Sequence, residues 1–576
     1  MLDWDIKSIP NLWLNSAEKK PDDQAIIHWD VMEGKHTWHN NELISAALLY
    51  TKFLIDNDVK KNDVCAVIIR HNPDFYPIYF AIGLIGAIPA ILAYPNRRLH
   101  ADKFRHGLSG MAMHSGLDWI LTEKELEDIV TPLISTQKNK IKGIIYPLTS
   151  DKGNIESSTH NDYLKACNAN LLTIDKNSPF LLQHSSGTTG LQKAVVLSHH
   201  AIIRHIQEYS SVLGISNSDK VVSWLPLYHD MGLIAAFHLP LICGIPTVQI
   251  DPFQWVSMPE LLIEVISKES GTITWLPNFA YDFMSDRIDQ DDIGQYNLKS
   301  LRLVINCSEP IRAESHEKFF TKFKSLGLQR SSLSSCYALA EATFAVTQTS
   351  HGAEAKKLNV NRDLFSKNIV EVISSPQSAQ DNIRSCVSSG KILPSCQVKI
   401  IDETNNELQE KKIGEIIIQS ASLFNEYRNA PQKTSSVLKD DWFYTGDMGF
   451  LLDDECYVIG RKDNLIICAG KNVYPEDIED VISEVPHVIP GRVVAFGIDR
   501  VELGTQTICA IVETSIDKDK QKDLKGNIKR ACMSINISIS DIYLVPARWL
   551  IKSSSGKPSR NINKKRILRD EHEKHG

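Results

Sequence analysis

Apolar side chains recur with two different periods along the first part of the chain. Residues 43–49 carry them at helical spacing, and the pattern continues through Phe53 and Leu54. Residues 64–70 form a compact run rich in valine and isoleucine, which suits a strand covered on both faces of a parallel sheet. A helix followed by such a strand predicts an α/β architecture.

One apolar run is long enough to be considered as a membrane span. Residues 75–94 contain no charged side chain, but Pro77, Gly83, Gly86 and Pro89 interrupt them. About 20 apolar residues without a break are normally needed to cross a bilayer. The interruptions therefore favour a buried helix over 75–84, a turn and a strand over 88–93, and we expect no membrane span.

A loop of small polar residues lies between two short apolar runs, residues 179–182 and 194–197, which we expect to be strands. It consists of six small residues, followed after two more positions by Lys193. The six residues are Ser185, Ser186, Gly187, Thr188, Thr189 and Gly190. Glycine lets backbone N–H groups turn inward, hydroxyl groups donate hydrogen bonds and lysine adds a positive charge, so such a loop can bind phosphate. The spacing of a Walker A motif is absent, and an ordinary surface linker remains the alternative.

Composition limits the class of protein. A chain of 576 residues is long for one core, so we expect two or more domains. The net charge of −7 argues against nucleic acid as a main partner. The 11 cysteines are odd in number and include no CxxC pair, which favours reduced thiols in a cytoplasmic protein. The first five residues are acidic rather than basic, so we expect no signal peptide.

Three other polar groups are ambiguous from the residues alone. His36 and His39 have the spacing of a metal-binding pair, but a surface turn is the simpler interpretation because no third ligand is near. Residues 96–98 could meet an anion or form a solvated loop. His229 and Asp230 are neighbours, and neighbours on an extended chain point to opposite faces, so a structural histidine is the default interpretation.

The loop SSGTTGLQK resembles the phosphate-loop signature of the adenylate-forming superfamily, S/T-S-G-S/T-T-G-x-P-K-G. Gln192 and Ala194 stand where proline and glycine are usual. The resemblance implies that the loop and Lys193 bind the phosphates of ATP, and that Thr188 helps to hold Mg²⁺. It also implies an α/β fold, with a large N-terminal domain of α/β subdomains and mostly parallel sheets.

Two further motifs resemble the adenine side of that superfamily. Residues 306–310 read NCSEP where relatives usually have G-A-E-P, so Cys307 and Ser308 replace two small residues. The resemblance places Ser308, Glu309 and Pro310 beside the adenine. Residues 337–343, YALAEAT, match Y-G-x-x-E-x-T, with Ala338 in place of glycine. Tyr337 would then stack on adenine, and Glu341 would ligate Mg²⁺, a hard cation that prefers oxygen.

The last third of the chain carries the remaining motifs of the resemblance. Residues 445–447, TGD, imply that Asp447 holds the ribose hydroxyl groups, and residues 460–463, GRKD, imply that Arg461 contacts ribose or phosphate and that Asp463 is a hinge. We therefore expect an N-terminal ATP- and acyl-binding domain over 1–460 and a small, mobile α+β domain over 461–576, in which 469–479 form a hairpin leading into a helix.

A second lysine lies in the tail segment SSSGKPSR. On its own this segment is a basic surface loop, and with residues 564–566 it could suggest a nucleic-acid tail. The resemblance instead implies that Lys557 enters the active site and bridges the carboxylate and the α-phosphate. We expect that role because the other motifs occur in the order typical of the family.

Two segments resemble the fatty acyl-AMP ligase branch of the superfamily. The segment PLYHDMGL implies that His229 lies beside the carboxylate being activated, and the aromatic residues of 275–281 would line an apolar acyl pocket or simply pack in the core. Residues near 351–386 are polar and lack a long apolar period, like the insertion of that branch, although a simple loop expansion remains open.

The resemblance implies ATP-dependent adenylation of a medium- or long-chain fatty acid, with Mg²⁺ as cofactor. The acyl group would pass to the phosphopantetheine of an acyl carrier protein or of a carrier domain in a polyketide or peptide synthase. A fatty acyl-CoA ligase is the first alternative. A non-catalytic adenylate-binding protein is the second, supported by the substitutions at Gln192, Ala194, Cys307 and Ala338. An amino-acid adenylation module, with Asp230 as an ammonium partner, is a weaker variant.

Overall fold

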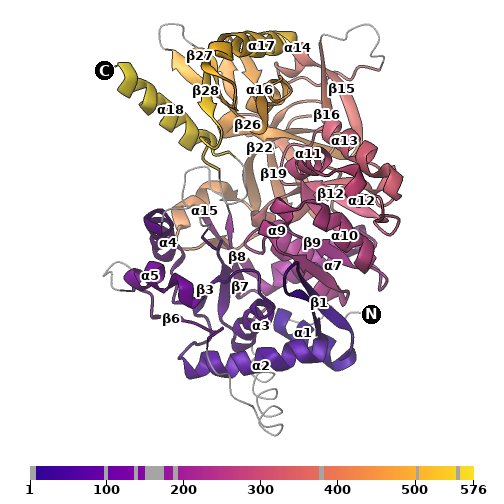
Figure 1. Ribbon diagram of the computed structural model, residues 1–576, viewed down its shortest axis with the longest axis vertical. Helices are drawn as coiled ribbons and strands as arrows, with labels where there is room; N and C mark the ends of the chain where they lie inside the picture. The colour runs from indigo at the N-terminus through magenta and orange to yellow at the C-terminus, as the bar shows by residue number, and fades with distance from the viewer. Residues whose placement is uncertain are drawn as a thin grey trace.

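The computed structural model describes residues 8–95, 101–134, 140–149, 174–185, 193–374, 382–500, 505–552 and 558–575. We call residues 8–460 the large segment and residues 461–575 the C-terminal segment. In Figure 1 the C-terminal segment lies at the upper end of the molecule, and the first helices, α1 (Ile9–Lys19), α2 (Asn40–Asp56) and α3 (Phe75–Ile85), lie at the lower end.

A long sheet runs through the large segment and changes character halfway. Its first half consists mainly of parallel strands: β1 (Gln24–Asp30), β10 (Thr247–Ile250), β9 (Val221–Ser223), β11 (Ile273–Pro277), β12 (Leu303–Cys307) and β13 (Leu333–Ala338), with β2 (Gly34–His39) antiparallel at the edge. All residues of β11 and β12 are buried, as expected for parallel strands covered on both faces.

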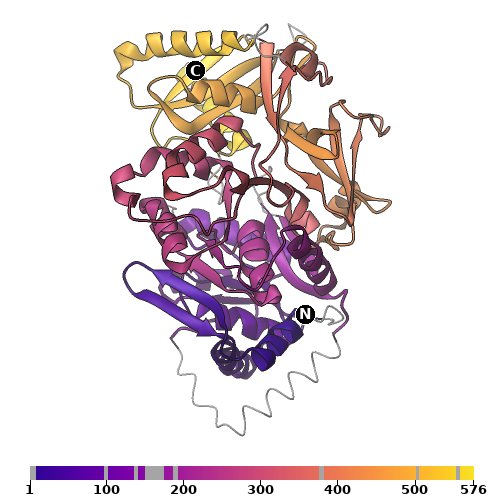
Figure 2. The same ribbon diagram turned by 90° about the vertical axis from the view of Figure 1, so that its right-hand side faces the viewer.

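The other half of this sheet is antiparallel. It contains β14 (Ala345–Gln348), β17 (Lys391–Ile392), β23 (Glu455–Arg461), β22 (Trp442–Leu452), β19 (Gly414–Ser420) and β18 (Cys396–Ile401), with β21 (Leu438–Lys439) paired to β22. Figure 2 shows its orange strands beside the magenta elements of the parallel half. The change of direction falls at β13 and β14, next to the predicted adenine motif.

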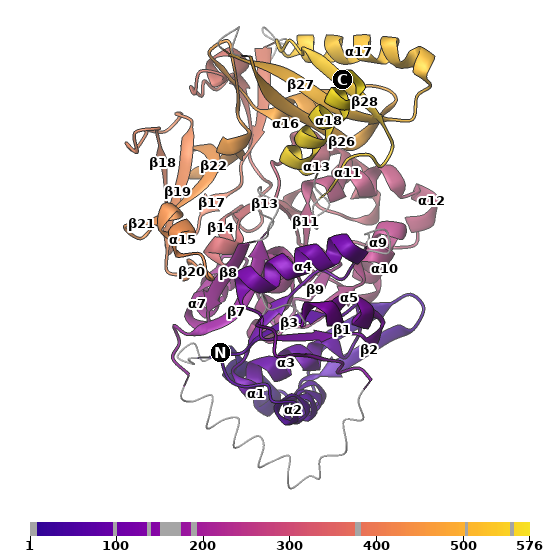
Figure 3. The ribbon, with the colours of Figure 1, turned by 90° about the vertical axis from the view of Figure 1, so that its left-hand side faces the viewer.

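Two smaller sheets of three and four strands accompany the long sheet in the large segment. One is fully parallel and contains β4 (Ile88–Ile91), β3 (Val64–Ile68), β5 (Trp119–Thr122) and β6 (Gly143–Ile145). The other is antiparallel and contains β20 (Glu426–Tyr427), β8 (Lys193–Ser198) and β7 (Pro179–Ser185). In Figure 3, α4 (Ala101–Ser115) and α5 (Glu127–Val130) lie beside β3. Strands β7 and β8 confirm the two strands predicted on either side of the small polar loop.

Helices cover the sheets where the periodicity predicts them. The predicted helix over 75–84 is α3, and α7 (His199–Val212) begins where the side chain of Ser198 accepts a hydrogen bond from the N–H of Ala201 at 3.1 Å. The other main helices of the large segment are α10 (Glu260–Glu269), α11 (Asn278–Arg287), α13 (Ala313–Phe323) and α15 (Pro431–Val437). Within the described ranges, no helix is both long and apolar enough to cross a membrane.

The C-terminal segment has its own mixed sheet. Strand β26 (Val488–Arg500) pairs antiparallel with β27 (Thr505–Thr514), which pairs parallel with β28 (Asp541–Pro546). Successive residues of β26 point to opposite faces: Val493 packs with α16 (Pro475–Ser483) and α17 (Gln521–Ser534), whereas Val494 packs with α18 (Arg560–His575). The predicted hairpin that leads into a helix is β24 (Ile466–Cys468), β25 (Lys471–Val473) and α16.

Two local expectations need correction or refinement. His36 and His39 lie in strand β2 and not in a surface turn, because this segment pairs with β1 along its length. The polar region near 351–386 is not without structure: β15 (Lys357–Asn361) and β16 (Ile383–Val387) form an antiparallel pair, with α14 (Arg362–Phe365) after β15. That region is an insertion only by resemblance, and this remains a prediction.

Candidate active site

One largely buried carboxylate, that of Asp447 in β22, is held from two sides by side chains of β13 and β23. The hydroxyl group of Tyr337, near the end of β13, donates to Oδ2 of Asp447 at 2.5 Å. Nη1 of Arg461, the last residue of β23, donates to Oδ1 of the same carboxylate at 3.0 Å. Burial raises the pKa of the Asp447 carboxyl, and the Arg461 guanidinium opposes that shift.

A second cluster joins the strand after the small polar loop to the predicted metal ligand. The hydroxyl group of Tyr427 donates to Oε1 of Glu341 at 2.7 Å, and Nζ of Lys193 lies 3.4 Å from the Tyr427 hydroxyl and 4.8 Å from the ring centroid. Burial lowers the pKa of the Lys193 ammonium, and the Glu341 carboxylate opposes that shift.

The two clusters form one site. Glu341 lies close enough to raise the pKa of Asp447, and Arg461 contributes to lowering the pKa of Lys193. Lys193, Glu341 and Asp447 therefore do not lie in separate cavities, an arrangement that would contradict a common binding site. The two clusters together contain two cations, two carboxylates and two tyrosine rings.

Most of the predicted phosphate loop lies outside the described residues. This holds for Ser186, Gly187, Thr188, Thr189 and Gly190, and also for Lys557. The two ends of the loop are described: Ser185 ends β7, Lys193 begins β8, and the two residues pair across the antiparallel strands. The loop therefore begins and ends beside the Glu341 cluster, and the roles of its residues stay predictions.

The adenine-side motif follows directly after β12. Ser308 is exposed at φ +71°, an unusual conformation for a residue with a side chain, and such conformations cluster at functional sites. Oε2 of Glu309 accepts a hydrogen bond from the N–H of Phe279 at 2.9 Å, which ties this motif to the start of α11. Pro310 is exposed, and Ala338 at the end of β13 is half-buried.

The turn that carries His229 is tightly packed. A Cβ on Gly232 would lie 2.3 Å from the carbonyl oxygen of Pro226, so only glycine fits there. Nε2 of Gln183, in β7, donates to the carbonyl oxygen of Tyr228 at 2.9 Å, and the rings of Tyr228 and His229 are 4.7 Å apart. His229 therefore occupies a fixed turn beside the strand that leads to the phosphate loop.

A π-helix over Met231–His238 continues from that turn, and π-helical turns are frequent at functional sites. Close by, the rings of Trp224 and Trp255 stack at 3.5 Å, and Phe279 contacts both rings edge-on. Phe279 is 37% exposed, so this aromatic group reaches the surface and can line an apolar pocket.

Two residues of the candidate site were not predicted from the sequence. Tyr427, in β20, contacts both Lys193 and Glu341. The hydroxyl group of Thr445 accepts a hydrogen bond from the N–H of Asp447 at 2.9 Å and donates one to the carbonyl oxygen of Ile416 at 2.7 Å, which fixes the turn before Asp447. No local motif marks Tyr427, because its position depends on the pairing of β20 with β8. A signal for Thr445 was present, since it belongs to the TGD motif.

The residues fit a divalent cation only together with a substrate. Within the described ranges, no group of three or more His, Cys, Asp or Glu side chains could hold a metal ion, and no hydrogen bond reaches Oε2 of Glu341. Mg²⁺ commonly binds through one or two carboxylates plus substrate phosphates and water. Glu341 can therefore supply one oxygen ligand.

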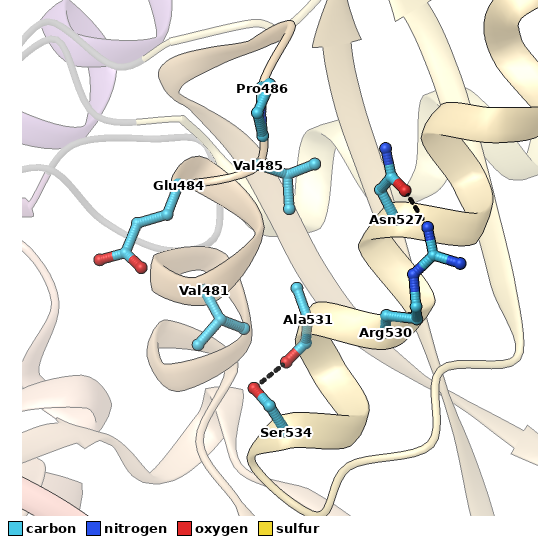
Figure 4. Close-up of a pocket in the computed structure, with 8 residues that line it drawn as sticks. All are labelled: Val481, Glu484, Val485, Pro486, Asn527, Arg530, Ala531 and Ser534. Atoms are coloured by element: carbon cyan, nitrogen blue, oxygen red, sulfur yellow. Dashed lines mark hydrogen bonds between the residues drawn. The ribbon is translucent and has the colours of Figure 1, made fainter.

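A cavity of about 280 Å³ lies elsewhere, between α16 and α17 (Figure 4). It is lined by Val481, Glu484, Val485, Pro486, Asn527, Arg530, Ala531 and Ser534. None of the predicted site residues is among them. The converging charges, and not this cavity, mark the candidate active site.

Comparisons with known proteins agree with this geometry. A family model described as AMP-binding enzyme matches residues 13–428. The chain is 27% identical to a putative acyl-CoA synthetase of Caulobacter vibrioides, with 92% of this chain and 90% of the relative covered. It is also 27% identical to the medium-chain-fatty-acid–acyl-carrier-protein ligase JamA of Moorena producens, with 89% and 87% covered.

The fold also matches solved structures. A chain from structural and functional studies of fatty acyl-adenylate ligases from E. coli and L. pneumophila superposes with a TM-score of 0.86. The match covers 98% of each chain at 23% sequence identity. This likeness confirms the predicted α/β fold.

Proposed function

The chain belongs to the AMP-binding enzyme family and is an acid-activating ligase, and on this premise we propose that it is a fatty acyl-AMP ligase that loads a carrier protein. A medium- or long-chain fatty acid reacts with ATP to give acyl-AMP and pyrophosphate. The acyl group then passes to a phosphopantetheine thiol. The observation that carries this proposal is the convergence of Lys193, Glu341, Tyr337, Asp447 and Arg461 from separate elements.

The first step needs positioning and charge neutralisation, and no protein nucleophile. A carboxylate oxygen of the fatty acid forms a bond to the α-phosphorus, and the bond between that phosphorus and the bridging oxygen of pyrophosphate breaks. Lys193 lies at the start of β8, where it can neutralise phosphate charge. Lys557 would stabilise the charge that develops between the two anions.

Asp447 and Tyr337 are placed to orient the nucleoside. A carboxylate can accept hydrogen bonds from both ribose hydroxyl groups, and Arg461 keeps that carboxylate directed into the site. When bound, Mg²⁺ would neutralise phosphate charge at Glu341 and Thr188. The hydrogen bond from Tyr427 restrains the Glu341 side chain.

In the second step, the thiol sulfur attacks the acyl carbon, the bond from that carbon to the AMP oxygen breaks, and the thiol proton passes to solvent. We propose that the C-terminal segment is a mobile domain whose rotation about Asp463 exposes the adenylate to the thiol. The aromatic group around Trp224, Trp255 and Phe279 would receive the acyl chain. The ten described cysteines are free thiols, which suits a reducing compartment such as the cytoplasm.

An acyl-CoA ligase is the second candidate, because one relative of equal identity is named an acyl-CoA synthetase. The region that holds the antiparallel pair of β15 and β16 resembles the insertion of fatty acyl-AMP ligases, and this resemblance supports the carrier protein as acceptor. A non-catalytic protein is less well supported, because the charged contacts at Lys193, Glu341, Asp447 and Arg461 are all in place.

The test is to incubate the protein with ATP, Mg²⁺ and fatty acids of increasing chain length. We measure pyrophosphate release and the mass of the nucleotide product, and then add either CoA or a holo carrier protein. Fatty-acid-dependent acyl-AMP that transfers to the carrier supports the proposal. Rapid acyl-CoA formation supports the second candidate, and absence of fatty-acid-dependent pyrophosphate release contradicts both.

A variant links this activity to the tail lysine. Lys557→Ala should lower the rate of acyl-AMP formation by about 10²- to 10³-fold, the usual loss when one charge-stabilising group is removed from a transition state. Lys565→Ala is the matched control, because Lys565 is an exposed lysine on α18 in the same tail. Equal rates for both variants would remove Lys557 from the mechanism.

A further inference from the structure

Helix α16 of the C-terminal segment carries four carboxylates within five residues, and arginines from different parts of the chain meet them. The carboxylates are Glu476, Asp477, Glu479 and Asp480. Arg560 pairs with Glu476 at 3.0 Å and also with Glu479, Arg384 pairs with Asp477 at 2.8 Å, and Arg312 pairs with Asp480. In Figures 1 and 3, α16 lies above α11 and α13, whose neighbourhood supplies Arg312.

These pairs differ in what they connect. Arg560 and its partners lie within the C-terminal segment, so a rotation of that segment leaves them intact. Arg312 and Arg384 lie in the large segment, so their ion pairs cross the predicted domain boundary. The crossing pairs must break in each rotation, and they therefore favour the orientation seen here.

Arg312 is connected to the predicted substrate walls by hydrogen bonds. Its backbone N–H donates to Oδ1 of Asn278 at 3.2 Å, and the same oxygen accepts from Nδ2 of Asn306 at 2.9 Å. Asn278 is the first residue of α11, next to Phe279 of the aromatic group, and Asn306 lies in β12 just before the adenine-side motif. Arg312 itself precedes the first residue of α13.

We infer that Arg312 is a positioning residue that holds the C-terminal segment against the acyl- and adenine-side walls through Asp480. This inference rests on the proposed function, because it needs a segment that rotates between two half-reactions. Arg312 acts through Asp480 and does not touch the reacting atoms. It sets how much of the protein occupies the present orientation.

The test measures that orientation without turnover. Met32 and Met533 are 89% and 68% exposed, one in each segment, so Met32→Cys and Met533→Cys provide label positions. The background carries Cys167, Cys243 and Cys468 replaced by serine. Double electron–electron resonance between spin labels at these two sites reports the distance distribution. We expect Arg312→Gln and Asp480→Asn each to lower the ratio of the present orientation to others by about fivefold, as for a half-buried ion pair.

Two further variants separate pairing from general damage. The double variant Arg312→Gln/Asp480→Asn should match the single variants, and the exchanged pair Arg312→Asp/Asp480→Arg should restore the original distribution. Arg330→Gln is the matched control, because Arg330 pairs with Glu317 at 2.6 Å entirely within the large segment. Additive single effects, no restoration, or a shift equal to that of the control would overturn the inference.

Kinetics give an independent readout. In single-turnover experiments, Arg312→Gln should change the ratio of the rate of acyl transfer to the rate of acyl-AMP formation by about fivefold. The exchanged pair should restore the wild-type ratio. If wild-type protein forms no acyl-AMP with any fatty acid, the proposed function fails, whereas the distance measurement still tests the Arg312–Asp480 pair. The two failures are thus distinguishable.

Discussion

The large segment and the C-terminal segment hold their functional residues by different forces. In the large segment, fully buried apolar strands such as β11 and β12 lead to the site, and the polar residues at their ends meet over a short distance. In the C-terminal segment, α16 packs on its own sheet through Ile478 and Ile482, whereas ion pairs connect it to the large segment. Apolar packing fixes one geometry, whereas ion pairs near a surface can break and re-form with little change in free energy. The difference suits a rigid site with a movable partner.

Buried histidines sharpen this contrast, because they belong to the large segment. Burial lowers the pKa to about 3 for His28, His199, His205, His238 and His316, and to about 4 for His184. The rings are neutral by geometry as well: Nδ1 of His199 accepts from the N–H of Ile9 at 3.2 Å, and Nε2 of His205 accepts from the N–H of Ala345 at 3.4 Å.

The largest expected effect is therefore acid unfolding of the large segment. A histidine whose pKa is lower in the folded than in the unfolded chain contributes stability that is present above pH 6.5 and is lost as the pH falls toward the folded pKa. At pH 5, each of the six should remove about 2 kcal/mol from the free energy of unfolding. Hydrogen exchange followed by mass spectrometry, from pH 7.5 to 5, measures this loss for each segment separately.

The C-terminal segment should show the opposite trend over the same range. Burial raises the pKa of Asp477 and Asp480, and raises that of Glu479 to about 7. A carboxyl with a raised folded pKa contributes stability that is lost as the pH rises through that value, so acidification down to pH 5 should not weaken this segment. Equal loss of protection in both segments would contradict the contrast.

A pair of glycines tests the difference in packing, with the second largest effect. Gly390 of the large segment has φ +97°, and a Cβ there would lie 2.1 Å from the carbonyl carbon of Gln348. Gly390→Ala should destabilise the protein by about 4 kcal/mol, from a left-handed conformation and from overpacking. In the C-terminal segment, Gly470 has φ +74° with no atom within 4 Å, so Gly470→Ala should lose only about 1 kcal/mol. Urea denaturation monitored by circular dichroism compares the two, and similar losses would argue against tighter packing of the large segment.

The same contrast explains what could be predicted from the sequence. Apolar runs alone predicted α3, β3, β4 and β8 to within a few residues, because burial on both faces leaves a pattern in neighbouring positions. Resemblance to a family added the order of the polar motifs, and the structure brings Lys193, Glu341 and Asp447 together as one site would require.

Contacts between distant residues could not be predicted in this way. Tyr427 meets Glu341 because β20 pairs with β8, and Arg312 meets Asp480 because α16 lies against the large segment. Neither pairing leaves a periodic signal, since each depends on tertiary arrangement rather than on spacing along the chain. The strand that contains His36 and His39 was not predicted for the same reason. Its side chains are polar, and its pairing with β1 is a backbone contact that the sequence pattern does not indicate.

Tyr427→Phe is the smallest of these perturbations and the most local. It removes the hydroxyl that donates to Glu341 at 2.7 Å and leaves the ring beneath Lys193, so the packing of the large segment should survive. A hydrogen bond to a charged group contributes about 2 kcal/mol, so kcat/KM for ATP should fall roughly 30-fold, with a higher Mg²⁺ concentration needed for half-maximal activity. Tyr474→Phe is the matched control in the C-terminal segment, because among the described residues no hydrogen bond reaches the hydroxyl of this buried tyrosine. If Tyr427→Phe keeps the wild-type Mg²⁺ dependence, then packing alone orients Glu341, and the carboxylate does not need the hydrogen bond from β20.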